Sequence, residues 1–295
     1  MISEKHLWLA IFFIFSISFF VACEKEPDLH TDFVKYSARV NINVADIKAK
    51  PERFSERVTQ ALYNEVVDVI DTVGRYSLIK QSDGYAGWIR NYCLDKNIEF
   101  SGDSPYFVDS FLAQALDKPS KNANRVTMFP YGCALYGEKE AGYLKIDSPR
   151  YGLVFVDENY ILDKNADISI IKLDSMSICA EAGKFIGAPY LWGGKTFYGI
   201  DCSGLTQMVM RKFGADLLRD SKDQKNQGIE IQREDIQPGD LIFFPKHVGI
   251  AVTKDIMIHS TGRNGGVAYN SINPDSPIYS QYHDENFETA RRVIE

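Results

Sequence analysis

The feature that most constrains the fold is a change of hydrophobic pattern at about Ile171. Beyond it, residues 174–187 carry apolar side chains at helical spacing. A second helical pattern begins at Cys202 and ends at Gly214, and four strand-like runs follow it: LIFF, HVGIAV, DIMIHST and ETARRVI. Helices followed by strands in this order predict one α+β domain over residues 171–295.

Residues 36–170, upstream of this change, show the pattern of short strands separated by turns. EVVDVID alternates imperfectly, and RYSLIKQSDGYAGWIR contains two strand patterns around a Ser-Asp-Gly turn. ALYGEKEAGYLKI and LVFVDENYILD form a second group around the turn DSPRYG. We expect two small barrels, at 36–118 and 119–170. Residues 104–122 carry apolar positions as on one helix face, ending at Pro119, and predict a helix inserted in the first barrel.

The N-terminal residues 1–23 have the composition of an export signal. A polar start with Lys5 precedes an apolar block that is shorter than the about 20 residues a spanning helix needs. Ala22 followed by Cys23 resembles a bacterial lipobox, so we expect cleavage before Cys23, a lipid on its thiol, and a tether over 24–35. A plain secretory signal or a short membrane anchor is the alternative. We expect an exported lipoprotein, anchored in a membrane of the bacterial envelope and facing the periplasm or the outer surface.

The net charge bears on the possible partners, and the cysteine content bears on disulfides. The net charge of −7 argues against nucleic acid, because phosphate binding needs a basic surface, and we expect a monomer. With Cys23 modified, four cysteines remain, but their spacing shows no disulfide framework. The sequence leaves open whether Cys93, Cys133 or Cys179 forms a disulfide.

Cys202 falls in the first turn of its predicted helix. There the unpaired N–H groups and the helix dipole favour a thiolate, so we expect its pKa to be lowered. A buried, inert cysteine would more naturally lie on the apolar stripe in mid-helix, but free cysteine is among the most commonly buried residue types, and from the helix alone an inert thiol is the more expected interpretation. The helix alone therefore does not establish Cys202 as a nucleophile.

Two histidines supply the base that such a nucleophile needs. His247 and His259 lie on a predicted hairpin, and a turn centred on Lys254 would make them diagonal neighbours on one face, within roughly 8 Å. A turn shifted by half a residue would put them on opposite faces. Gly249 would keep the shared face open. The two histidines with Cys202 could instead bind zinc, but the cysteine lies 45 residues upstream and no supporting carboxylate is identifiable. We therefore expect a catalytic set, with no metal and no cofactor.

Four blocks in order now carry a resemblance. DCSGL, PGDLIFF, HVGI and MIHS resemble the NlpC-type papain-like cysteine peptidases, which hydrolyse bacterial cell-wall peptides. The upstream barrels are similar to bacterial SH3-type domains through GYAGW and VADIKAKP. The implied architecture is α+β, with two SH3-like barrels before a papain-like domain, and it looks like that of γ-D-glutamyl-L-diamino acid peptidases of murein stem peptides.

The resemblance also implies roles for single residues. Cys202 would attack the γ-glutamyl carbonyl, His247 would act as base, and His259 would orient it. Tyr190 would help to hold the oxyanion. The implied substrate-binding residues are Trp192, Asp201, Ser203, Asp220 and Ser221.

In three-domain members of this family, the first barrel closes the groove and grips the free amine of an N-terminal L-Ala. Glu65 and Tyr85 are our candidates for that clamp, which would make the protein a dipeptidyl-peptidase releasing L-Ala-D-Glu. A cell-wall-binding lipoprotein, or an endopeptidase, amidase or acyltransferase on the same fold, remains the alternative. The sequence does not distinguish diaminopimelate from lysine, exopeptidase from endopeptidase, or one membrane leaflet from another.

Overall fold

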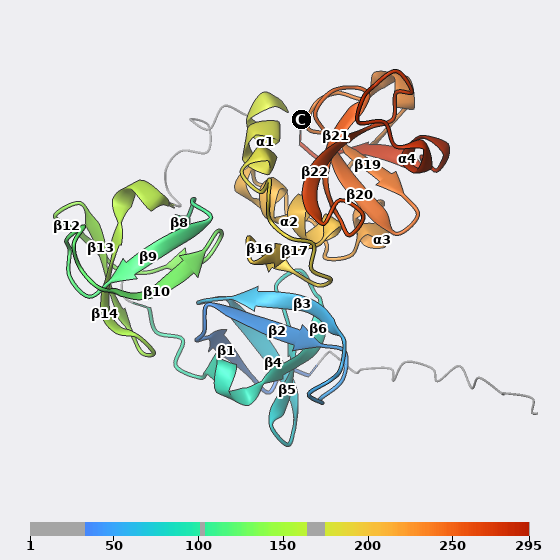
Figure 1. Cartoon of the computed structure of the whole chain (residues 1–295). Coiled ribbons are helices and arrows are strands. Elements are labelled where there is room, and N and C mark those ends of the chain that lie inside the picture. The colour runs from blue at the N-terminus through green and yellow to red at the C-terminus, as the bar shows by residue number, and fades with distance from the viewer. Residues whose placement is uncertain (1–32, 101–103, 164–174, 295) are drawn as a thin grey trace, which may run out of the picture. The chain divides into compact units, whose positions relative to one another are not determined.

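A computed structural model describes residues 33–100, 104–163 and 175–294. The predicted signal, Cys23 and most of the tether lie outside these ranges. Within them, no helix combines the length and the apolar character needed to cross a bilayer. Figure 1 shows the described chain as two strand-rich regions followed by a region of helices and strands.

The first β domain is one antiparallel sheet of seven strands in the order β3-β2-β6-β5-β4-β1-β7. Its predicted strands around the Ser-Asp-Gly turn are confirmed as β5 and β6. The core contains β-branched side chains such as Val67, Val69 and Ile79, which pack well on the pleated surface of a sheet. The strands are β1 (Tyr36–Val40), β2 (Val44–Lys48), β3 (Arg57–Leu62), β4 (Val66–Val73), β5 (Tyr76–Lys80), β6 (Ala86–Arg90) and β7 (Leu94–Asp95).

The imperfect alternation in EVVDVID has a structural cause. Along β4, Val67 and Val69 are buried, but the register with β5 shifts between Val69 and Asp71. The extra residue, Ile70, is buried as well. A β-bulge of this kind interrupts the period of two and bends the strand.

The second β domain contains two antiparallel sheets, ordered β10-β9-β14-β13-β12 and β11-β8-β15. Leu144, Ile146, Val154 and Val156 provide its core from paired strands. The strands are β8 (Tyr106–Val108), β9 (Leu112–Leu116), β10 (Arg125–Pro130), β11 (Ala134–Leu135), β12 (Glu138–Glu140), β13 (Tyr143–Ser148), β14 (Gly152–Asp157) and β15 (Ile161–Asp163).

The predicted helix over 104–122 is wrong, because this segment forms β8 and β9. In β9, Ala113 and Ala115 point into the core and Gln114 is exposed, which is a period of two. Phe111, assigned to the helix face, instead stacks on Phe197 of the C-terminal domain at 4.4 Å between ring centroids. Tertiary packing therefore explains the apolar positions that imitated a helix.

Strand pairing also moves the boundary between the two β domains. β9 pairs with β10 and β14, so the boundary expected at residue 118 falls inside the second β domain. The sheets divide between Asp95 and Tyr106.

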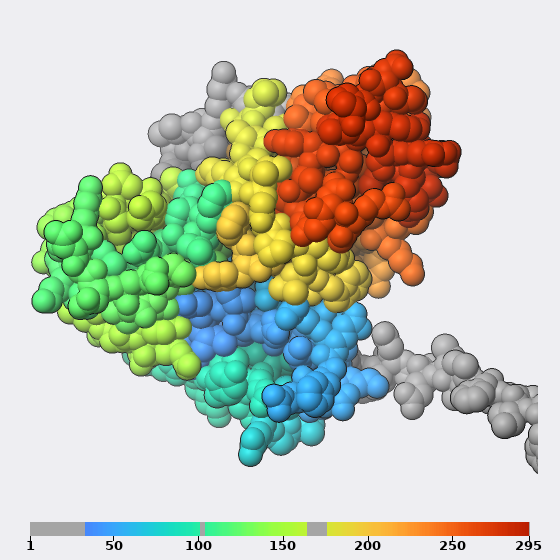
Figure 2. Space-filling view, viewed as in Figure 1, coloured from blue at the N-terminus to red at the C-terminus, as the bar shows by residue number. Residues whose placement is uncertain are grey.

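The C-terminal domain combines helices with a six-stranded sheet, ordered β18-β23-β19-β20-β21-β22, which confirms the predicted α+β class. Four of these strands are the predicted runs, and β18 and β22 are additional. Figure 2 shows the residues of its last strands packed into a continuous orange and red surface. Its helices are α1 (Ser175–Gly183), α2 (Cys202–Lys212), α3 (Ser221–Gln224) and α4 (Gln281–Glu285). Its strands are β16 (Lys195–Thr196), β17 (Gly199–Ile200), β18 (Ile229–Ile231), β19 (Leu241–Phe244), β20 (His247–Ala251), β21 (Ile256–Thr261), β22 (Gly266–Ser271) and β23 (Thr289–Arg292).

Candidate active site

Cys202 is the first residue of α2, as predicted. Asp201 is the N-cap, and its Oδ1 accepts a hydrogen bond from the Gly204 N–H at 2.7 Å. The Cys202 side chain is 7% exposed and packs in the core that also contains Val248 of β20. The start of α2 therefore positions the thiol in the core next to β20, the strand that begins at His247.

The expected lowering of the Cys202 pKa is not found. Burial, with the negative charge of Asp201 added, raises the pKa of the Cys202 thiol to about 11. The N–H groups of Val248 and Ser203 face the sulfur and oppose this shift, but burial outweighs them. In this state Cys202 is a neutral thiol at neutral pH, so an attack on a carbonyl requires a base that removes its proton.

The hairpin that carries the two histidines has the predicted register. Ile250 pairs with Ile258 and Ala251 with Met257. His247 Nε2 and His259 Nδ1 lie 2.6 Å apart, which is a hydrogen bond. The expectation that these side chains share one face is confirmed.

Gly249 lies between the two histidines on that face. A Cβ built on it would lie 3.3 Å from the Cβ of His259 and 3.0 Å from the sulfur of Met257. Glycine therefore leaves the space that lets His259 approach His247.

Asn270 fixes which nitrogen carries the proton in both rings. Its Nδ2 donates to the Ile278 carbonyl, so its Oδ1 faces His259 Nε2 at 2.8 Å and must accept from it. His259 Nδ1 then has a lone pair and accepts the proton of His247 Nε2. This leaves His247 Nδ1 as the nitrogen that is free to take a proton.

Both imidazoles are neutral in this environment. Burial, followed by the neighbouring rings of His259 and His283, lowers the pKa of His247 to about 2. Burial lowers the pKa of His259 to about 4, although its bond to Asn270 opposes the change. With a neutral thiol on Cys202 and a neutral imidazole on His247, proton transfer between them would belong to the reaction itself.

A third histidine, to which the sequence analysis gives no role, lies against this pair. His283 of α4 is 6% exposed, and its ring centroid is 4.9 Å from that of His259 and 5.4 Å from that of His247. Its Nδ1 is 2.7 Å from Ser280 Oγ. Burial lowers its pKa to about 4. No spacing relates α4 to the hairpin in the sequence, so only the fold reveals this cluster.

Arg219 is a second residue that the sequence did not single out. It is 2% exposed, and its Nη2 lies 2.6 Å from Asp201 Oδ2. Its Nη1 donates to Asp201 Oδ1 and to Ser203 Oγ. Burial opposes the charge on Arg219, but the Asp201 carboxylate outweighs burial and raises its pKa.

These bonds change the interpretation of Asp201 and Ser203. Both Asp201 oxygens are already engaged, since Oδ2 also accepts from the Gly193 N–H at 2.8 Å. Ser203 is 6% exposed and is bonded to Arg219. The two side chains hold the helix start in position rather than offering free groups to a substrate.

Strand β3 of the first β domain forms hydrogen bonds with Arg219 and with the segment before Cys202. Arg219 Nε donates to Thr59 Oγ1 at 2.8 Å, and the Lys195 N–H donates to Gln60 Oε1 at 2.9 Å. Arg57 Nη1 donates to the Trp192 carbonyl at 3.1 Å. Gly193 next to it has φ +73° and would place a Cβ 2.8 Å from the Arg57 carbonyl, so only glycine fits there.

Tyr190 and Trp192 flank this segment. Burial, with the charges of Cys202 and Asp201 added, raises the pKa of Tyr190 to about 12, so its hydroxyl keeps its proton and can donate. The Trp192 side chain is 56% exposed. An indole with that exposure is not part of the core.

The first β domain reaches the site through Tyr85. Burial raises the pKa of Tyr85, and Asp220, which its hydroxyl contacts, adds to the shift. Asp220 directly precedes α3, whose first residue is Ser221, and its side chain makes no capping bond to that helix. Burial raises the pKa of Asp220, against the attraction of Arg219.

Glu65 does not join Tyr85 in the part of the chain that the structure describes. Its carboxylate accepts from the Leu62 N–H and from Gln81 Nε2. The structure thus brings Tyr85 to Asp220, whereas Glu65 lines a different hollow, of about 240 Å³, together with Lys195 and Gln207 of the C-terminal domain.

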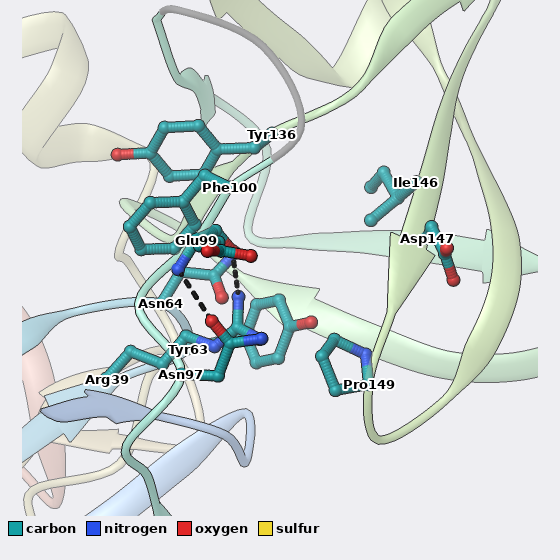
Figure 3. Close-up of a pocket in the computed structure, with 10 residues that line it drawn as sticks. All are labelled: Arg39, Tyr63, Asn64, Asn97, Glu99, Phe100, Tyr136, Ile146, Asp147 and Pro149. Atoms are coloured by element: carbon teal, nitrogen blue, oxygen red, sulfur yellow. Dashed lines mark hydrogen bonds between the residues drawn. The ribbon is translucent and has the colours of Figure 1, made fainter.

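A separate hollow of about 410 Å³ lies between the two β domains (Figure 3). Arg39 Nη1 donates to the Glu99 carbonyl at its rim, and the rings of Phe100 and Tyr136 stack at 4.0 Å. None of the predicted site residues lines it. We assign it no part in the chemistry.

The fold and the Cys–His–His arrangement define a papain-like domain that follows SH3-like domains. Residues 187–289 match the NlpC/P60 family, and residues 48–92 match the bacterial dipeptidyl-peptidase SH3 domain. The chain is 33% identical, over 47% of its length, to a probable endopeptidase of Haemophilus influenzae, and covers 87% of that protein. The chain therefore belongs to the NlpC/P60 family of peptidases.

Longer relatives include the β domains as well. A γ-D-glutamyl-L-lysine dipeptidyl-peptidase of Bacillus subtilis is 29% identical over 70% of this chain and 73% of the relative. The crystal structure of an NlpC/P60 family protein from Bacillus cereus superposes with a TM-score of 0.76 at 22% identity, over 88% of this chain and all of the other. This second likeness concerns the fold alone.

Proposed function

We propose that the protein is a cysteine peptidase that hydrolyses the γ-D-glutamyl–diamino acid bond of murein stem peptides and releases L-Ala-D-Glu. The hydrogen bonds that join His247 to His259 and His259 to Asn270 support the chemistry, as does the Cys202 sulfur facing the N–H of Val248, the residue after His247. Relatives named γ-D-glutamyl-L-lysine dipeptidyl-peptidases support the substrate class. Export and lipidation of Cys23 belong to the same proposal. They would put the enzyme beside its substrate.

The reaction needs no group beyond this chain and water. The Cys202 proton passes to His247 Nδ1 as the sulfur attacks the γ-carbonyl carbon, and Tyr190 with the helix N-terminus stabilises the oxyanion. The C–N bond then breaks, and the proton on His247 goes to the leaving amine of the diamino acid. Water, deprotonated by His247, hydrolyses the thioester, and the proton returns to the sulfur.

The observation that carries the dipeptidyl specificity is the contact between Tyr85 and Asp220. A tyrosine hydroxyl and a carboxylate from two domains form the kind of pair that binds an ammonium group. We place the free amine of L-Ala there, with Asp220 in the role first given to Glu65. Trp192 would cover the peptide, and Ser221 would line the same end of the groove.

The test uses the full chain and peptides L-Ala-γ-D-Glu-L-Lys and L-Ala-γ-D-Glu-diaminopimelate, free or N-acetylated, with products identified by mass. Release of L-Ala-D-Glu from the free peptides alone supports the whole proposal. Equal cleavage of the acetylated peptides would contradict the proposed amine-binding site but would leave the proposed peptidase activity standing. No turnover of any murein fragment would favour a cell-wall-binding protein, and the two diamino acids are compared in the same assay.

A further inference from the structure

We infer that His247, His259 and His283 form a binding site for a divalent transition-metal ion, with Zn²⁺ as the best match, and that metal binding switches the active site off. The inference goes beyond the proposed reaction, which does not use His283. The claim that the metal inhibits the enzyme rests on the proposed function. The claim that the three histidines bind a metal does not.

The three side chains each offer one nitrogen, and these nitrogens lie within 4.8 Å of one another. In a tetrahedral site with Zn–N distances of about 2.0–2.1 Å, two nitrogens lie about 3.3 Å apart. The closest contact, His247 Nε2 to His259 Nδ1, is 2.6 Å and must open slightly. The longest must close by about 1.5 Å, the difference between 4.8 and 3.3 Å, which small ring rotations supply.

The rings already have the supporting bonds typical of metal-bound histidines. His259 Nε2 donates to Asn270 Oδ1, which leaves Nδ1 with its lone pair. His283 Nδ1 shares a hydrogen bond with Ser280 Oγ, which leaves Nε2 as the nitrogen that can bind a metal. In both rings one nitrogen is held by the protein and the other remains for a metal.

Metal binding at His247 is incompatible with its role as a base. The Nε2 proton now shared with His259 would have to leave that nitrogen before a metal could bind it. The proton kept by a neutral, metal-bound imidazole would then be on Nδ1, where it blocks transfer from the Cys202 thiol. The metal thus replaces the proton between the two histidines and removes the base.

The ligand atoms of the cluster favour a transition-metal ion that prefers nitrogen ligands over a hard ion that prefers oxygen ligands. Among the described residues the group contains three imidazoles and no carboxylate, which suits Zn²⁺, Cu²⁺ or Ni²⁺ and not Mg²⁺. Arg263 acts electrostatically on His283 and opposes a cation. A hollow of about 510 Å³ lined by Asn270, Ser280 and Glu285 gives a polar approach beside the rings.

Zinc could also bind Cys202 and His247 without His283, so the experiment separates these sites. Zn²⁺ is titrated calorimetrically into the full chain carrying Cys202→Ala, and then into Cys202→Ala combined with His283→Phe. We expect binding to survive the first change and to weaken by at least about tenfold in the second. Binding lost with Cys202→Ala, or unchanged by His283→Phe, would overturn the inference.

Further variants guard against misfolding and report the ligands. His283→Gln replaces the ring without adding an apolar group, and Tyr282→Phe is a matched control at the neighbouring, exposed position. Co²⁺ should give the visible bands of a tetrahedral nitrogen site without a thiolate charge-transfer band. In the peptidase assay, His283→Phe should keep metal-free turnover and raise the Zn²⁺ concentration for half-inhibition at least about tenfold. Equal inhibition of both proteins would contradict the site.

Discussion

Arg219 and Asp201 form an ion pair of 2.6 Å whose side chains are 1% and 7% exposed. The same carboxylate caps the helix that begins with Cys202, and the same guanidinium bonds Thr59 of the first β domain. The position of the thiol therefore depends on a residue of another domain. This link explains how the first β domain can matter for chemistry that it does not perform.

Removing Arg219 should destabilise the protein and impair turnover together. Arg219→Met leaves the Asp201 carboxylate buried without its partner, which costs about 3–5 kcal/mol of unfolding free energy. Thr59→Val, which loses only one neutral bond to Arg219, should cost about 1 kcal/mol. Urea unfolding measures both. Equal effects of the two changes would show that the ion pair is not what holds the helix start.

Asn270 should act through the tautomer of His259. Asn270→Ala removes the acceptor for His259 Nε2–H and should lower kcat about 10–100-fold with little change in KM. Asn270→Asp keeps an acceptor and should stay within about tenfold of the natural protein. Asn264→Ala, which removes only the other partner of Asn270 Oδ1, is the control. If the alanine and aspartate variants of Asn270 lose activity equally, the tautomer account is wrong.

Alkylation of Cys202 should report its raised pKa. With a pKa of about 11, the thiolate fraction and the rate with iodoacetamide should rise about tenfold per pH unit between pH 7 and 10. Peptide mapping identifies the labelled cysteine, and Cys202→Ser is the control. A rate that is already constant from about pH 5 upward would indicate a thiolate–imidazolium pair in the free protein.

The buried imidazoles should make the fold sensitive to acid. Unfolded histidines take up a proton below about pH 6.5, whereas His283, with a pKa of about 4, stays neutral when folded. Stability is therefore lost as the pH falls from 6.5 toward 4, by about 1.4 kcal/mol per pH unit for each such group. His283→Phe should reduce the loss between pH 7 and pH 5 by about 2 kcal/mol. Urea unfolding at the two pH values tests this, and an unchanged difference would contradict the burial of a neutral ring.

Local patterns predicted most of the fold because they follow from local physics. The start of α2 at Cys202 and the register of the His247–His259 hairpin depend on a cap and on a period of two. The helix expected over 104–122 was wrong because Phe111 packs across a domain boundary, which no local pattern records.

The residues of the active site also differ in how far the sequence could predict them. Cys202, His247 and His259 lie in short segments whose local sequence patterns predict a helix start and a hairpin. Arg219 and His283 matter only through contacts made by folding, and the burial that raises the pKa of Cys202 is likewise a property of the packed domain.

The central claim is that the Cys202 sulfur attacks the γ-glutamyl carbonyl. The most direct measurement mixes the full chain with L-Ala-γ-D-Glu-L-Lys or its diaminopimelate counterpart, quenches in acid within the first turnover, and maps the protein by mass spectrometry. The account predicts an L-Ala-γ-D-Glu thioester on the peptide that contains Cys202, formed by the natural protein and absent from Cys202→Ala. Turnover of these peptides by Cys202→Ala, or an adduct on another residue, would contradict it.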